Sequence, residues 1–219
     1  MDVSRSSFIV TVAGAAVALS GPAAARAQVP EPAAPPAFEV MASGGIAIPA
    51  GGLADITSAG PALGGSVSYR FLPHFGFRAG VGADLLDGTQ DAQGNQFPST
   101  SMVHITGGLL VDLARPDWQD SPLTTSVDVG LGITHMKTNA SDVPAPVGGF
   151  SKTFFAATGG LRIGWRFDEH VEAFGEGRTY MTLGKRGDLA VLSNHSPAVG
   201  SLRDLWSFPI TAGVRVTFQ

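Results

Sequence analysis

The last stretch of the chain, residues 205–218, alternates strictly between apolar residues and small or polar ones. The apolar positions are Trp206, Phe208, Ile210, Ala212, Val214, Val216 and Phe218. A period of two residues indicates a β-strand whose two faces meet different surroundings. The alternation covers the roughly 9–11 residues that a tilted strand needs to cross a membrane. The pattern is typical of a strand in a membrane-spanning barrel, provided that the rest of the chain repeats it.

Seven more segments show the same alternation, at residues 38–48, 63–71, 75–85, 102–113, 123–135, 153–167 and 171–181. Short turns join some of them, at 73–74, 115–122 and 168–170. Longer loops join the others, at 49–62, 87–101, 137–152 and 182–203. Short and long connections strictly alternate, as in an up-and-down membrane barrel. We therefore predict an all-β fold, an eight-stranded antiparallel up-and-down transmembrane β-barrel over residues 38–219.

The charged residues of the strands lie on the polar face. They are Arg70, Arg78, Asp84, Asp112, Asp128, Arg162, Arg166, Glu172, Glu176, Arg178 and Arg215. An Arg facing lipid at mid-membrane costs about 2–4 kcal/mol, so we expect these residues to face the lumen. Side chains fill a barrel of eight strands, and we therefore predict a charge network that plugs it. Structural packing is favoured over a gated ion path. A soluble lipocalin-like barrel would instead carry apolar residues inside.

Aromatic residues gather near the predicted short turns, where a girdle at the membrane interface is expected. They are Phe38, Phe71, Phe75, Phe77, Trp118, Trp165, Phe167 and Phe218. A thinner set at the other rim is predicted from Phe155, Tyr180 and Trp206.

The N-terminus has the layout of a secretory signal peptide over residues 1–27. Arg5 precedes an apolar segment, and Ala25-Arg26-Ala27 provides a small-x-small cleavage pattern. Residues 28–37 are rich in Pro and Ala and are expected to form an extended lead-in. Charged residues make up only 15% of the chain, below the roughly 25% of soluble domains. Cysteine is absent, which excludes disulfides and thiolate metal sites.

Residues 38–219, with their strand pattern and the Gly-Val-Arg-Val-Thr-Phe ending, resemble the OmpA/OmpX-like outer-membrane β-barrel superfamily, the small porin-family proteins of Gram-negative bacteria. The resemblance implies export through the periplasm to the bacterial outer membrane. It implies contact with outer-membrane lipid and lipopolysaccharide. It also implies insertion by the barrel-assembly machinery, which reads a C-terminal aromatic residue. That signal is Phe218 here, displaced by one position because Gln219 follows it.

The expected function is structural or surface-interacting, in a monomer whose long extracellular loops contact any partner. The alternatives are a narrow pore for ions or small solutes and, third, a lipid-modifying enzyme. An enzyme is disfavoured because the suggestive cluster Asn194-His195-Ser196, near Asp188 and Asp204, lies in the longest loop, and adjacent residues of an extended chain point to opposite sides. The five His residues lack metal-ligand spacing, so no metal or cofactor is expected. A net charge of −4 without a basic stripe gives no reason to expect nucleic-acid binding.

Overall fold

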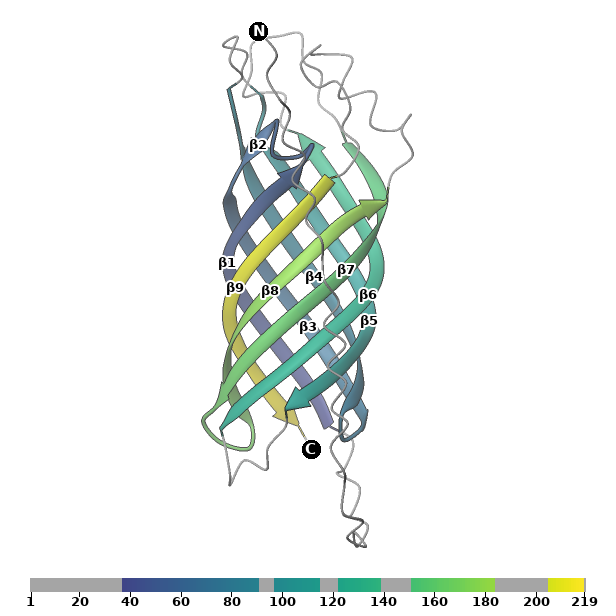
Figure 1. Ribbon diagram of the computed structural model, residues 1–219, viewed down its shortest axis with the longest axis vertical. Coiled ribbons are helices and arrows are strands. Elements are labelled where there is room, and N and C mark those ends of the chain that lie inside the picture. Colours follow the sequence, from purple (N-terminus) through teal and green to yellow (C-terminus); the bar gives the residue numbers. More distant parts are fainter. Residues whose placement is uncertain (1–36, 91–96, 115–121, 139–150, 184–204, 219) are drawn as a thin grey trace, which may run out of the picture. The chain divides into compact units, whose positions relative to one another are not determined.

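The barrel is built from long antiparallel strands (Figure 1). The computed structural model describes residues 37–90, 97–114, 122–138, 151–183 and 205–218. Within them the long strands are β1 (Ala37–Gly51), β3 (Gly60–Leu72), β4 (Phe75–Gly88), β5 (Thr100–Ala114), β6 (Leu123–Thr138), β7 (Ser151–Arg166), β8 (Val171–Leu183) and β9 (Leu205–Phe218). A two-residue strand, β2 (Thr57–Ser58), lies between β1 and β3 and pairs with β4. No helix in the described residues is long and apolar enough to span a membrane.

The sheet closes on itself. Each long strand pairs antiparallel with the next one along the chain, and β1 pairs with β9 from Phe38–Phe218 to Gly51–Leu205. The described residues thus confirm the predicted eight-stranded up-and-down barrel. Observed strands continue two or three residues into the predicted loops, because backbone pairing does not stop where the membrane ends. The predicted loop 49–62 is accordingly shorter, with β1 reaching Gly51 and β3 starting at Gly60.

The two ends of the barrel differ in their connections. The Phe38–Phe218 pairing puts the start of β1 and the end of β9 at the same end as the β3–β4 and β7–β8 turns. We call this the turn end, and the opposite end, where the longer connections lie, the loop end. Phe38 and Phe218 lie 6.4 Å apart between ring centroids at the turn end. Trp118 of the predicted girdle lies outside the described residues, as do residues 1–27 and 28–36 of the predicted signal peptide and lead-in.

The strands are staggered by ten residues around the barrel. Following the paired residues once around leads through Glu39, Ser68, Arg78, Gly108, Gly130, Thr158, Tyr180, Ser207 and Pro49. The path returns to β1 ten residues beyond its start, at Pro49 instead of Glu39. Such a stagger requires tilted strands, typically by 35–45° from the barrel axis. In Figure 1 the strands cross the barrel obliquely.

Alternate residues point outward and inward along every long strand. Along the middle of the barrel the outward face is mainly apolar and exposed, with Leu131, Phe155 and Ile163 as examples. The inward face holds the buried Glu, Asp and Arg residues together with His104. This is the distribution that lipid outside and a filled lumen inside require.

The β7–β8 turn is fixed by its own side chain. The backbone N–H groups of His170 and Val171 donate to Asp168 Oδ1 at 2.7 and 2.8 Å. These two hydrogen bonds favour the charged carboxylate and lower the pKa of Asp168.

Candidate functional site

The lumen holds four successive layers of inward-facing side chains. Nearest the turn end is the lower cluster, made of Glu39, Arg70, Asp112, Glu172 and Arg215. Arg70 Nε lies 2.8 Å from Glu39 Oε1, and Arg70 also contacts Asp112. Arg215 Nη1 lies 3.3 Å from Glu39 Oε1, and Nη2 contacts Glu172. These ion pairs tie five different strands together, with Glu39 on β1 at their centre.

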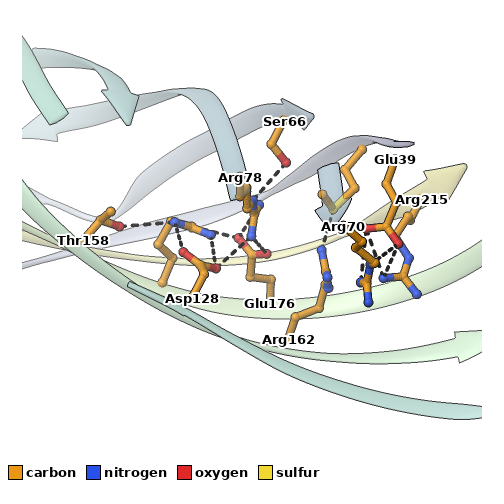
Figure 2. A network of polar contacts seen from close by, with 11 residues as sticks. Glu39, Ser66, Arg70, Arg78, Asp128, Thr158, Arg162, Glu176 and Arg215 are labelled. Atoms are coloured by element: carbon orange, nitrogen blue, oxygen red, sulfur yellow. Dashed lines mark hydrogen bonds and ion pairs between the residues drawn. The ribbon is translucent and has the colours of Figure 1, made fainter. Parts of the chain in front are cut away.

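The second layer is a ring of two arginines and two carboxylates, of which Figure 2 labels Arg78, Asp128 and Glu176. We call Arg78, Asp128, Glu176 and Arg178 the charge ring. Arg78 binds Glu176 with two donors, at 2.6 and 3.1 Å, and Asp128 at 3.0 Å. Arg178 binds Asp128 with two donors, at 2.6 and 2.9 Å, and Glu176 at 2.9 Å. Each arginine therefore contacts both carboxylates, and no side chain of the ring is more than 11% exposed.

Arg162 lies between these two layers (Figure 2). Its Nη1 donates to Met41 Sδ, and its guanidinium carbon lies 5.6 Å from the centre of the Phe174 ring. Its Nη2 has no hydrogen-bond partner among the described residues. A guanidinium over an aromatic face is favourable, so Phe174 and Met41 give Arg162 a partly apolar setting.

The third layer, above the charge ring, is the histidine layer: Asp84, His104, Thr134, Tyr180 and Ser207. His104 is fully buried; its Nε2 lies 3.0 Å from Asp84 Oδ2 and its Nδ1 lies 2.9 Å from Thr134 Oγ1. Ser207 donates to the same Asp84 oxygen. The Tyr180 ring is stacked on His104, with centroids 3.8 Å apart. A cavity of about 40 Å³ is lined by Asp84 and Tyr180 of this layer and by Arg78 and Glu176 of the charge ring.

The prediction from the sequence was wrong for the position of Tyr180. It was expected at the outer rim among the aromatic residues, but its side chain is buried in the lumen. The reason is its position on β8, because Tyr180 has the same inward parity as Glu176 and Arg178. Its hydroxyl thereby stays in a polar interior.

The fourth layer closes the loop end and is apolar. We call it the apolar cap; it consists of Ala47, Leu53, Ile56, Ala62, Leu86, Met102, Met136, Phe154 and Leu205. Leu53 and Ile56 come from the β1–β3 connection, which folds into the barrel mouth and is held by a hydrogen bond from Thr57 N to Leu53 O at 3.0 Å. Phe97 packs against the cap. Buried threonines, Thr57, Thr100, Thr138 and Thr182, lie at the same end, so an ion crossing the lumen would meet a layer that is mainly apolar.

The predicted charge residues thus divide among separate places. Arg70, Asp112, Glu172 and Arg215 meet in the lower cluster, and Arg78, Asp128, Glu176 and Arg178 meet in the charge ring. Asp84 binds His104 and Ser207 instead of an arginine. Arg166 lies at the turn end of β7, paired in register with Glu172. Phe218 faces outward at the end of β9 and is 53% exposed.

Sequence reasoning missed Glu39 and the apolar cap. Glu39 has the inward parity of its strand, so the alternation alone could have added it to the charged set. Leu86, Met102 and Phe154 were detectable as apolar residues at inward positions near the loop end. Leu53 and Ile56 carry no such signal, because they belong to a connection.

The described residues bear on two kinds of chemistry, nucleophilic catalysis and metal binding. Thr134, His104 and Asp84 form a hydroxyl–imidazole–carboxylate line like that of a nucleophile, base and orienting group. All three are at most 2% exposed, below the apolar cap. The loop cluster Asn194-His195-Ser196, with Asp188 and Asp204, lies outside the described residues. Among the described residues no group of three or more His, Cys, Asp or Glu could hold a metal ion.

Comparisons with known proteins agree with this architecture. A family model described as "Outer membrane protein beta-barrel domain" matches residues 11–200. Among curated protein sequences, none is similar enough to be recognised as a relative.

Several solved structures of bacterial surface and outer membrane proteins are similar to this chain. Neisserial surface protein A (NspA) is 15% identical, with a TM-score of 0.56 over 83% of this chain and 99% of that one. The outer membrane protein OprG from Pseudomonas aeruginosa is 12% identical, with a TM-score of 0.51 over 83% and 96%. A major outer membrane protein from Thermus thermophilus is 13% identical, with a TM-score of 0.51 over 84% and 99%. At these identities the likeness concerns the fold.

Proposed function

This chain belongs to the outer membrane β-barrel protein family and is located in the bacterial outer membrane, and from that premise we propose that it is a closed barrel that presents its long loops at the cell surface. Barrels of this kind have short periplasmic turns and longer extracellular loops. The loop end of the barrel is therefore the extracellular end. The proposed role is structural and surface-interacting, with any partner contacted by the loops.

The observation that carries the proposal is the filling of the lumen. The charge ring crosses it with six hydrogen bonds between its arginines and carboxylates. The apolar cap covers the extracellular mouth. A permeating ion would have to break buried ion pairs, each costing several kcal/mol to separate, and then pass an apolar layer. Hydrophobic constrictions act as gates in channels.

The pore alternative makes a different prediction about the same residues. It requires that the charge ring exchange partners and that Leu53 and Ile56 leave the mouth together. The cavity beside the ring, lined by Arg78, Glu176 and Tyr180, would then be part of a water path. The buried His104–Asp84–Thr134 line supports no enzyme in this proposal, because a lipid or peptide substrate could not reach it past the cap.

The test is single-channel conductance of the refolded chain without its predicted signal peptide, residues 28–219, in a planar bilayer. A heat-modifiability gel shows that the inserted protein is folded. We expect a folded barrel without conductance steps. Reproducible steps that change in size in Arg78→Ala or Glu176→Ala would overturn the proposal and favour a narrow pore.

A further inference from the structure

The outward face of the barrel carries a polar patch at the loop end of β5, β6 and β7. Its members present hydroxyl, imidazole or ammonium groups, and we call them the rim patch: Ser101, His135, Lys137, Ser151 and Thr153. Lys137 pairs in register with Ser101 on one side and Ser151 on the other, and His135 pairs with Thr153. The patch is therefore a compact block across three neighbouring strands.

The depth of the patch follows from the lengths of the apolar stretches beneath it. On β6 the outward residues from Leu123 to Ile133 are apolar except for one threonine, and on β7 those from Phe155 to Trp165 are apolar or glycine. Each stretch spans eleven residues, about the length of a strand that crosses the hydrocarbon core. His135 is the first outward residue beyond this length.

The side chains of the patch are organised around His135. Its Nδ1 lies 2.9 Å from Thr153 Oγ1, and its Nε2 lies 3.3 Å from Ser151 Oγ. These contacts hold two hydroxyl groups on the same face as the exposed Lys137. The outward carboxylate of Asp87 lies on β4, with β5 between it and Lys137. An ammonium group beside hydroxyl groups that an imidazole holds in place is suited to a phosphate.

We propose that the rim patch binds a phosphate group on the headgroup of an outer-leaflet lipid. Three points favour this occupant: the patch lies at the end that the proposed function makes extracellular, it begins where the apolar stretches end, and the charge of Lys137 is opposite to that of a phosphate. Ile133, Phe155 and Leu183 form the apolar row directly below and would contact the acyl chains of the same lipid. The inference concerns the outer wall of the barrel and is independent of the closed lumen.

The experiment uses the full-length chain, exported in a Gram-negative host and purified from its outer membrane in detergent. Binding of bisphosphorylated lipid A and of its dephosphorylated form is titrated by native mass spectrometry. The double variant Lys137→Gln with His135→Gln removes the ammonium group and the imidazole that holds the two hydroxyl groups, without adding bulk. His170→Gln, in the turn at the opposite end, removes an exposed imidazole outside the patch and is the matched control. Lys137→Arg keeps the charge.

We expect the double variant to lose about tenfold in apparent affinity for the phosphorylated lipid, equivalent to about 1.4 kcal/mol. The His170→Gln control and Lys137→Arg should bind like the unmodified protein, and the dephosphorylated lipid should bind weakly to all. Unchanged affinity in the double variant, or equal affinity for the two lipids, would overturn the proposal. If the double variant does not fold, chemical acetylation of Lys137 in the unmodified protein tests the site instead. The phosphorylated lipid should protect Lys137 from acetylation, and unchanged labelling would refute the site.

Discussion

Replacing Asp128 by Asn tests how strongly the charge ring stabilises the barrel. The change keeps the shape of the side chain and removes its charge. Asp128 accepts one hydrogen bond from Arg78 and two from Arg178. After the change, two arginines would face the single carboxylate of Glu176 inside a lumen where neither arginine is more than 11% exposed.

The expected loss of unfolding free energy in Asp128→Asn follows from the arginine charge that is left without a carboxylate partner. Removing one partner of a buried ion pair typically costs about 3–5 kcal/mol, and Asp128 serves two arginines. The stability of a whole domain is about 5–15 kcal/mol, so the change should be readily measurable. Adding Arg78→Gln restores equal numbers of positive and negative charges in the ring. The double variant should therefore be more stable than the sum of the two single changes predicts, by about 0.5–3 kcal/mol.

The assay is urea unfolding of the refolded protein in lipid vesicles, followed by tryptophan fluorescence and by gel mobility. Asp87→Asn is the control, because Asp87 is an exposed carboxylate outside the lumen. The free energy of unfolding of Asp87→Asn should stay within about 0.5 kcal/mol of that of the unmodified protein. The reasoning fails if Asp128→Asn is equally stable, or if the energies of Asp128→Asn and Arg78→Gln simply add.

Three further changes examine other parts of the barrel. Leu86→Ala leaves a cavity in the apolar cap and should cost about 2–5 kcal/mol in the same assay; the outward Leu85→Ala should cost less, and equal losses would argue against a packed cap. His104→Ala leaves the buried Asp84 without its imidazole donor and should cost about 1–3 kcal/mol, a loss that Asp84→Asn in the same chain should reduce. Asp168→Asn removes a carboxylate whose pKa is lowered in the folded state. The stabilising effect of the Asp168 carboxylate should be present above the ordinary Asp pKa of about 3.9 and should disappear as the pH falls through the lowered pKa. The unfolding curves of the variant and of the unmodified protein should therefore differ at neutral pH and converge in acid.

The strand positions could be predicted from the sequence because one physical rule governs them. A strand between lipid and a polar lumen must alternate, so β9 and its seven counterparts could be identified from their residues alone. The same parity assigned Arg78, Asp128 and Glu176 to the interior. Tyr180 was misplaced because its aromatic character was given more weight than its inward position.

The partners inside the lumen could not be predicted. Arg78 and Glu176 are separated by 98 positions in the chain, and their contact depends on a stagger of ten residues that no single strand encodes. A different stagger would join other arginines to other carboxylates from the same sequence. The apolar cap could not be predicted in full for a similar reason, because Leu53 and Ile56 reach the barrel mouth only through the fold of the β1–β3 connection.

The pairing of β1 with β9 has a consequence for assembly. Glu39 lies on the first strand and contacts Arg215 on the last, 176 positions away. Until that seam closes, Glu39 has only Arg70 as a cationic partner and needs water in place of Arg215. Loss of water from the lumen and joining of the seam must therefore occur together, as a late event in biogenesis. A nascent chain that stops before β9 would leave charged groups facing lipid at an open edge, and such truncated intermediates should remain outside the hydrocarbon layer.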